Sequence, residues 1–307
     1  MAAGAGIRGV LVLTGPTAVG KTELAISHAA RFGAEIVSAD ARQIYRDMPI
    51  GTAAPTADQR ARAPHHLVGF LDPALRYSAA RYAIDATAAI RGIHGRGHRA
   101  IVVGGTGFYV RALCGDVALS PAYDPALRAR LAREAHLHPP DVLHAWLAAL
   151  APQRAAAVPA SDRYRVTRAL EVALARDGAA RDDAGTAGRH EPRLHFAKVF
   201  VDLADAGLAE RIVARVDAML AAGFVEEAER IGAEAVAADA VGYPHALAYV
   251  RGWCTQAELR ALLVRETRRY AKRQRTWFRR EPGVTWVDGA GAEASTVAVA
   301  RDFLGWS

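Results

Sequence analysis

The sequence predicts an α/β protein with a parallel sheet and a mainly helical insertion. Two observations carry this prediction. Short apolar runs alternate with segments of helical periodicity over roughly the first 110 residues, a pattern typical of strands joined by crossover helices. After Gly115 the pattern becomes helical with no convincing strand, until one apolar run returns near residue 200.

The individual elements follow from these patterns. Strands are expected at residues 9–14, 35–38, 100–103 and 196–202, because each is a short, largely apolar run. Helices are expected at 23–32, 80–93, 206–229 and 255–280, and the chain after residue 206 is expected to be mostly helical. The core would comprise 1–120 and 191–307. The insertion would comprise 121–190, with helices from Asp124 to about Arg176 and a polar, glycine-rich mobile loop over 177–192.

Composition excludes several classes of protein. No apolar run approaches the roughly 18 residues of a membrane span, and the first residues do not resemble a signal peptide. The isolated Cys114 and Cys254 fit no ligand spacing, which favours a reducing cytoplasm and no structural metal. The net charge of +7 favours a polyanionic partner. Eight basic residues and one acid fall between Arg265 and Arg280.

A glycine-rich loop follows the first expected strand and opens the first expected helix. It meets the pattern G-x-x-x-x-G-K-[ST], which predicts a phosphate-binding P-loop and a P-loop NTPase-like core. Backbone amides and the helix N-terminus would bind phosphate oxygens. Lysine occurs at only three positions, and Lys21 is one of them. The expected diphosphate-binding residues are Gly15, Pro16, Thr17, Ala18, Val19, Gly20, Lys21 and Thr22.

The identity of the ligand depends on a nearby acid. The loop alone would predict an ATP-binding, nucleotide-binding protein in which the Thr22 hydroxyl ligates Mg²⁺. The strand at 100–103 ends in Gly104-Gly105 without an acid, whereas the strand at 35–38 leads to Asp40. Asp40 is equally compatible with a helix cap or a turn, where aspartate is favoured.

Five motifs in order resemble one family. After the P-loop come Ser38-Ala39-Asp40-Ala41-Arg42-Gln43-Ile44-Tyr45, Gly51-Thr52-Ala53-Ala54-Pro55, Pro64-His65-His66-Leu67, Gly104-Gly105-Thr106-Gly107-Phe108-Tyr109 and Tyr270-Ala271-Lys272-Arg273-Gln274-Arg275-Thr276-Trp277-Phe278-Arg279. The set spans nearly the whole chain and resembles the tRNA dimethylallyltransferases. That resemblance implies transfer of a dimethylallyl group from dimethylallyl diphosphate to N6 of the adenosine 3′ of the anticodon, with release of diphosphate. It also implies a P-loop core with a helical insertion.

The resemblance implies three catalytic residues. The exocyclic amine of adenine is a poor nucleophile and needs a base, which would be Asp40. Thr106 would orient the same amine, and Arg215 rather than Arg211 would help to bind the leaving diphosphate. From the residues alone, Thr106 could equally be a turn residue, and the two arginines could be a solvated helix face.

The resemblance also implies RNA-contacting segments, and the basic, aromatic helix near the C-terminus suits phosphate contacts and base stacking. The same helix could instead be solvated and lie on the core through Leu263, Tyr270 and Trp277. The target base would leave its stack and enter the site. The expected tRNA-binding residues are Asp40, Ala41, Arg42, Gln43, Tyr164, Arg165, Val166, Thr167, Arg168, Val241, Gly242, Tyr243, Lys272, Arg273, Gln274, Arg275, Thr276, Trp277, Phe278 and Arg279.

Two features leave questions open. The family usually has serine at Ala41, and often has basic residues before and after 241–243, where Asp239, Ala240 and Pro244 stand. His65 and His66 lack further ligands at metal spacing and are interpreted as structural or as part of a channel wall.

The expected partners are tRNA and dimethylallyl diphosphate, with no membrane, and the protein is expected to be a monomer. Three alternatives remain open: prenyl transfer to free AMP, a P-loop kinase acting on a small molecule, and a non-catalytic RNA-binding or nucleotide-sensing module.

Overall fold

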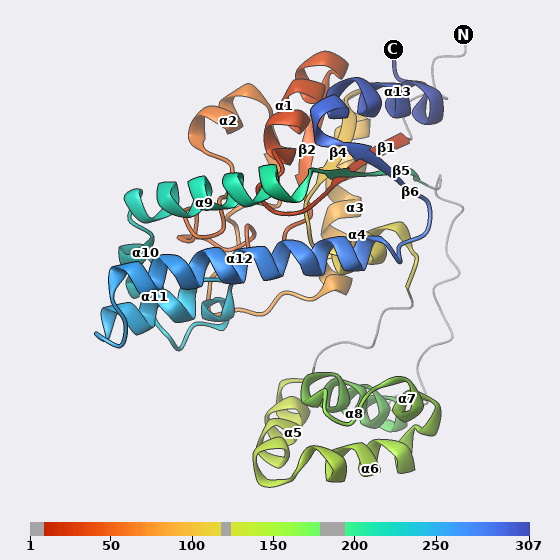
Figure 1. Ribbon diagram of the computed structural model, residues 1–307. Helices are drawn as coiled ribbons and strands as arrows, with labels where there is room; N and C mark the ends of the chain where they lie inside the picture. Colours follow the sequence, from red (N-terminus) through yellow and green to blue (C-terminus); the bar gives the residue numbers. More distant parts are fainter. Residues whose placement is uncertain (1–8, 118–123, 179–193) are drawn as a thin grey trace. The chain divides into compact units, whose positions relative to one another are not determined.

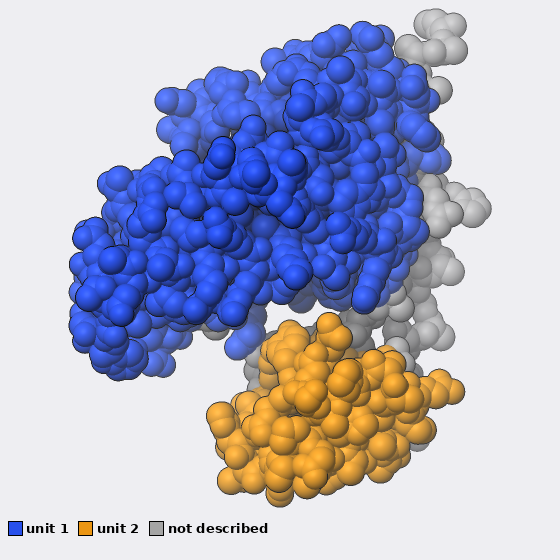
Figure 2. Space-filling view, viewed as in Figure 1, with its two compact units in different colours: residues 1–117, 192–307 blue, residues 118–191 orange. Residues whose placement is uncertain are grey.

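A six-stranded parallel sheet forms the centre of the larger of two compact units (Figure 1). The computed structural model describes residues 9–117, 124–178 and 194–307. Unit 1 comprises residues 1–117 and 192–307, and unit 2 comprises residues 118–191; Figure 2 colours them separately. The strands are β1 (Gly9–Thr14), β2 (Ala34–Ser38), β3 (His65–His66), β4 (Arg99–Val103), β5 (His195–Asp202) and β6 (Val284–Asp288).

The sheet order is β3-β2-β4-β1-β5-β6, and every neighbouring pair is parallel. The predicted α/β class with a parallel sheet is confirmed. The helices of unit 1 are α1 (Lys21–Phe32), α2 (Ala57–Arg62), α3 (Ala79–Gly95), α4 (Gly107–Cys114), α9 (Asp205–Ala221), α10 (Phe224–Ile231), α11 (Tyr243–Val250), α12 (Gln256–Phe278) and α13 (Ala292–Leu304).

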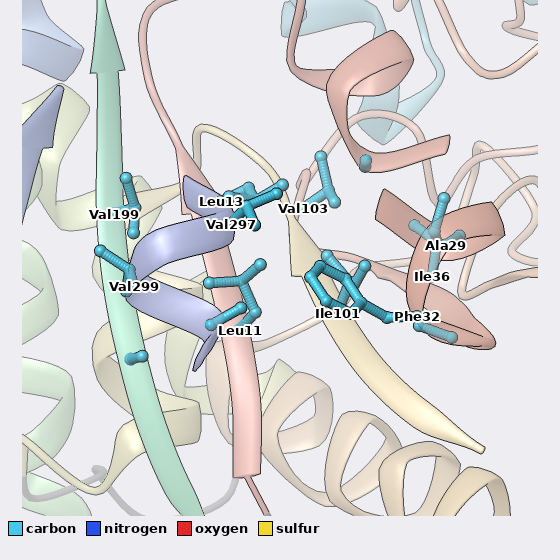
Figure 3. Packing of buried hydrophobic residues seen from close by; sticks show 14 of the residues in the cluster. Leu11, Leu13, Ala29, Phe32, Ile36, Ile101, Val103, Val199, Val297 and Val299 are labelled. Carbon is cyan, nitrogen blue, oxygen red and sulfur yellow. The ribbon is translucent and has the colours of Figure 1, made fainter. Parts of the chain in front are cut away.

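Side chains alternate between the two faces of the sheet, and each face packs against helices. Leu11, Leu13 and Ile101 lie on one face with α1 and α13, as Figure 3 shows. Val10 and Val102 lie on the other face with α3 and α4. Because successive strand residues point to opposite faces, continuous apolar runs are buried on both sides.

Four helices of unit 1 form a separate cluster beyond the sheet. Buried residues of α9, α10, α11 and α12 pack together, with Phe224, Tyr243 and Leu263 among them. Helix α12 begins with a capping box between Thr255 and Glu258, which satisfies its first free amides. The capping box therefore sets the first residue of this 23-residue helix, which packs alongside α9 (Figure 1).

Unit 2 is a small helical unit with its own core. Its helices are α5 (Pro125–Leu137), α6 (Pro140–Leu150), α7 (Pro152–Ala157) and α8 (Arg163–Gly178). Three of them carry proline in the first turn, where no amide partner is needed. Leu143, Leu147 and Leu170 are buried at its centre. The mobile loop expected over 177–192 falls almost entirely outside the described residues.

The chain after residue 206 is mostly helical, as expected, but it also contains a strand that the sequence did not predict. Strand β6 (Val284–Asp288) forms the sheet edge beside β5. Three of its five residues are exposed, so it lacks the buried apolar run that predicted β1, β2, β4 and β5. Strand β3 was also missed, because two histidines carry no strand pattern. Among the described residues, no helix is both long and apolar enough to cross a bilayer.

Candidate active site

A cavity of about 1270 Å³ opens where the carboxyl ends of β1, β2 and β4 meet. Ligands of parallel α/β proteins bind at this edge of the sheet. The P-loop forms one side of the cavity, Asp40 and Thr106 line its middle, and α9 and α12 contribute further walls. All lining residues belong to unit 1. The volume exceeds the roughly 300–1,000 Å³ of a typical small-molecule site, so it has room for two reactants.

The P-loop connects β1 to α1. Lys21 and Thr22 are the first two residues of α1 and line the cavity. The Lys21 Nζ donates to the carbonyl oxygens of Gly15, at 3.0 Å, and of Pro16, at 2.8 Å. Burial lowers the pKa of Lys21 to about 8; Asp40 opposes this shift and Arg215 adds to it. An anion that enters the site would therefore favour the protonated form of Lys21.

The ends of β2 and β4 bring Asp40 and Thr106 together. The amide of Ala41 donates to Thr106 Oγ1 at 2.9 Å, and Asp40 Oδ1 accepts from the amides of Arg42 and Gln43 at 2.8 and 3.3 Å. Asp40 thus stabilises the turn that follows it, as the alternative interpretation held, and Thr106 is the N-cap residue of α4. Both also line the cavity, so the two interpretations are compatible.

Arginines 211 and 215 of α9 have different surroundings. Arg211 Nη1 donates to the Val19 carbonyl at 2.9 Å and braces the P-loop from outside. Arg215 lines the cavity. Burial lowers the pKa of the Arg215 guanidinium, while the charge of Asp40 and the phenol of Tyr270 oppose the shift. Of the two, Arg215 is the one that faces an incoming ligand.

Sequence reasoning missed two roles on α12. Tyr270 lines the cavity, and burial raises the pKa of its phenol, an effect that the Thr106 side chain opposes. Gln274 Oε1 accepts from the Thr17 amide at 2.8 Å, and its Nε2 donates to the Gly105 carbonyl at 3.1 Å. A Cβ at Gly105 would lie 1.9 Å from that nitrogen, so a side chain there would displace the Gln274 amide. The spacing of Tyr270, Gln274 and Trp277, all in the cavity wall, is one helix face and could have revealed them.

The structure separates the expected tRNA-binding residues by exposure. Lys272, Arg273, Thr276 and Arg279 are exposed on α12, and Tyr164 is 71% exposed on α8 of unit 2. Cavity walls include Ala41, Arg42, Gln43, Val241 and Trp277. In unit 2, Arg165 pairs with Asp162 and Arg168 with Glu171, and the Thr167 hydroxyl donates to the Arg163 carbonyl.

Other side chains on that list are engaged within the protein. Phe278 and Val166 are buried in the cores of units 1 and 2. Gln274 is 5% exposed because it bridges the P-loop and Gly105. Arg275 binds Asp202 at 2.7 Å and also contacts Asp205 and the Leu203 carbonyl.

Tyr243 is also buried rather than presented to RNA. Its hydroxyl donates to Glu227 Oε1 at 2.7 Å. The Glu227 carboxylate is fully buried and also accepts from the amides of Ile50, at 2.8 Å, and Gly51, at 2.7 Å. Since residues 49–57 line the cavity, this carboxylate fixes one of its walls.

Asp239, one of the departures from the family pattern, pairs with an expected RNA contact. Its carboxylate lies 2.7 Å from Arg42 Nη1. Both side chains line the cavity and are partly exposed. Arg42 must therefore share its charge between this acid and any RNA phosphate.

Of the two histidines, only His66 belongs to an ion cluster, which lies toward the other end of the sheet. His66 Nε2 lies 2.7 Å from a Glu35 carboxylate oxygen, and Arg96 and His98 bind the same carboxylate. These contacts hold the pKa of Glu35 at about 2, chiefly through Arg96, against the effect of burial. His65 Nδ1 is 2.8 Å from the Ala63 carbonyl. No group of three or more metal-binding side chains occurs within the described ranges.

Comparison with known proteins decides the family. The model of the family described as IPP transferase matches residues 43–281, and that described as isopentenyl transferase matches residues 8–63. The chain belongs to the IPP transferase family. The resemblance to tRNA dimethylallyltransferases is thereby confirmed.

Named relatives and solved structures agree. The chain is 39% identical to a tRNA dimethylallyltransferase of Geobacter sulfurreducens, over 96% of this chain and 97% of that protein. It is 45% identical to one from Anaeromyxobacter sp., over 91% and 92%. The crystal structure of a tRNA isopentenylpyrophosphate transferase from Bacillus halodurans matches with a TM-score of 0.70, 32% identity and 97% coverage of both chains. A eukaryotic dimethylallyltransferase shares the fold, with a TM-score of 0.75 and 24% identity.

Proposed function

We propose that this protein transfers a dimethylallyl group from dimethylallyl diphosphate to N6 of the adenosine 3′ of the anticodon in tRNA, and releases diphosphate. One observation carries the proposal: a P-loop and an acid, Asp40, line the same two-reactant cavity in a chain of the IPP transferase family. The P-loop suits a diphosphate, and the acid suits the activation of an amine.

The reaction assigns a role to each side of the cavity. The adenine leaves its stack and places its amine against Asp40 and Thr106, which is cheaper from a loop than from a duplex. As the N6–C1 bond forms, the C1–O bond of the diphosphate ester breaks. Asp40 accepts the amine proton, and the negative charge of the leaving group is stabilised by the P-loop amides, Lys21 and Arg215.

The residues present fit a magnesium ion that is held mostly by the substrate. Thr22 places a hydroxyl in the cavity beside Lys21, and Mg²⁺ commonly takes one or two protein oxygens together with phosphate oxygens and water. When bound, Mg²⁺ would neutralise charge on the diphosphate. Thr22 would hold it, while Lys21 and the amides hold the phosphate oxygens.

The exposed side chains of α12 suit the tRNA backbone. Lys272, Arg273 and Arg279 supply exposed positive charge, and Arg273 also lines the cavity. Contacts of these side chains with RNA phosphates would make binding weaken steeply with salt. Since one chain supplies every wall of the cavity, a monomer would suffice. A tRNA substrate is consistent with action in the cytoplasm.

The deciding experiment has three reactions, each with the protein and Mg²⁺. Two contain labelled dimethylallyl diphosphate, with unmodified tRNA as the acceptor in one and AMP in the other. The third contains ATP in place of the prenyl donor, with candidate metabolites as acceptors. We expect label in tRNA only. Label in AMP alone would favour the free-nucleotide alternative, and phosphate transfer from ATP without prenyl transfer would favour a kinase. Binding of tRNA without any transfer would leave a non-catalytic RNA-binding module.

A further inference from the structure

Lys198, one of only three lysines, is not used by the proposed reaction but lies in a buried ion network. Its Nζ lies 2.8 Å from Asp116 Oδ2 and 3.4 Å from Glu281 Oε1, and its side chain is 9% exposed. The Glu281 side chain is fully buried, and its Oε2 accepts from Arg111 Nε at 2.9 Å and Nη2 at 2.7 Å. Two cations and two anions thus form a charge-balanced group.

The network ends at an aromatic residue in the cavity wall. The Arg111 guanidinium carbon lies 4.6 Å from the centre of the Trp277 ring. Phe108 meets the same ring edge-on, with centroids 6.3 Å apart. A Cβ at Gly107 would lie 2.1 Å from the indole, so the backbone after Thr106 is pressed against it. Trp277, Phe108 and Gly107 all line the cavity.

No hydrogen bond fixes the orientation of this indole. Trp277 Nε1 is buried without a hydrogen-bond partner in the part of the chain that the structure describes. Buried indole N–H groups usually find a partner, so packing alone holds the ring in place. The charged group in that packing is the Arg111 guanidinium, which lies against the Trp277 ring. Glu281 holds this guanidinium through two hydrogen bonds.

We propose that Lys198, Asp116 and Glu281 are positioning residues that hold Arg111 against Trp277 and so fix the cavity wall beside Thr106. Glu281 binds Arg111 directly. Lys198 balances the charge of Glu281 and pairs with Asp116. Burial disfavours the Lys198 ammonium, but Asp116, Cys114 and Glu281 outweigh it and raise its pKa. A compact ammonium suits this contact with two carboxylates, which explains a lysine in an arginine-rich chain.

The consequence for catalysis rests on the proposed tRNA substrate. Trp277, in the cavity wall beside Thr106, is placed to stack on the flipped adenine or on the neighbouring base. Loss of such base stacking weakens the binding of single-stranded RNA. The consequence for the indole itself does not depend on the substrate. The two consequences can therefore be measured separately.

The test compares Glu281→Gln with Glu35→Gln. Glutamine keeps the size and one acceptor oxygen but removes the charge. Glu35 is a matched control because it is also a buried carboxylate, 5% exposed at its side chain, bound by an arginine and two histidines. It lies near the amino end of β2, whereas the cavity lies at the carboxyl ends. Arg111→Lys is a second test variant, which keeps the charge but loses the planar guanidinium.

Two readouts are measured in each variant. Subtracting the emission of a Trp277→Phe version isolates the fluorescence of Trp277, and steady-state kinetics give KM for each substrate. We expect Glu281→Gln and Arg111→Lys to make Trp277 more quenchable by acrylamide. We also expect them to raise KM for tRNA by roughly tenfold, the low end of one lost stacking contact, with KM for dimethylallyl diphosphate within about twofold. Glu35→Gln should lower thermal stability without changing either readout.

Unchanged Trp277 quenching in both test variants would overturn the proposal, as would equal kinetic effects in Glu35→Gln. If Glu281→Gln does not fold, Arg111→Lys decides the question. If the wild-type protein transfers no label to tRNA but the quenching still responds, the proposed function is wrong and the positioning role stands.

Discussion

The two sides of the cavity differ in how they are built. The proposed diphosphate side is one continuous segment, Gly15 to Thr22, which leads into α1. The proposed RNA side is assembled from the ends of β2 and β4, from α9, from the loop at 239–241 and from one face of α12. Lys21 and Thr22 both line the cavity, whereas several residues expected to contact RNA are buried in one core or the other.

The difference follows from which atoms do the binding. A P-loop binds through backbone amides and a helix N-terminus, so its local sequence nearly determines its shape. An RNA surface depends on side-chain exposure, which distant packing decides. On α12, Arg273 is exposed while Arg275, two residues later, is 16% exposed at its side chain and bound to Asp202. A segment that is expected to contact RNA can therefore have half of its residues facing inward.

The largest expected effect separates chemistry from binding on the RNA side. Asp40→Asn keeps an oxygen that can accept from the Arg42 amide but removes the base. We expect single-turnover prenyl transfer to fall by roughly 10²–10⁴-fold, the usual contribution of a general base. Affinity for tRNA should change by less than about threefold. Unchanged transfer would remove Asp40 as the base, and a matching loss of tRNA affinity would make it a binding residue instead.

The second prediction concerns the diphosphate side. The buried ammonium of Lys21 has a pKa of about 8, and a bound diphosphate raises it, so binding takes up a proton above that pH. Affinity for dimethylallyl diphosphate should be constant below about pH 8. It should then fall as the pH rises, approaching tenfold per pH unit.

Lys21→Ala supplies the control for that pH dependence. It should weaken diphosphate binding by roughly 10–100-fold, as expected for loss of a charge-assisted hydrogen bond, and abolish the decline above pH 8. Calorimetric titration from pH 6.5 to 9.5 measures both quantities. A variant that still loses affinity above pH 8 would assign the titration to another group.

The sequence predicts the α/β core and the site motifs because both are local. Strand β1, the P-loop and Asp40 lie within the first 40 residues, and their patterns are continuous. Gln274 shows what local patterns miss. It belongs to a basic segment, yet its amide joins the P-loop to Gly105 across a sequence separation of 257 and 169 residues. Such contacts exist only once the sheet has formed.

Strand β6 was not predicted for a related reason. It lies at the sheet edge with most of its residues exposed, so it contains no continuous apolar run. Pairing with β5 defines it. Edge strands of this kind depend on a neighbour rather than on their own periodicity.

A third prediction tests inward and outward residues on the same helix. Lys272→Gln should weaken tRNA binding and reduce the salt dependence by about one phosphate contact. Arg275→Gln should leave tRNA affinity within about twofold but destabilise the fold by about 1–3 kcal/mol, since Asp202 loses its charged partner. Filter binding at several salt concentrations and thermal unfolding measure the two effects. If Arg275→Gln changed the salt dependence instead, Arg275 would be an RNA contact after all.

The smallest expected effect is at Tyr243. Tyr243→Phe removes the hydroxyl bonded to Glu227 but leaves the two amides of Ile50 and Gly51 on that carboxylate. We expect a loss of about 0.5–1.5 kcal/mol in unfolding free energy and unchanged tRNA affinity.

Glu227→Gln should have a larger effect than Tyr243→Phe, because the glutamine amide nitrogen cannot accept a hydrogen bond and must face a backbone donor. It should destabilise the fold more and raise KM for dimethylallyl diphosphate as the wall at 49–57 loosens. A selective loss of tRNA affinity in Tyr243→Phe would instead show that Tyr243 contributes to RNA binding.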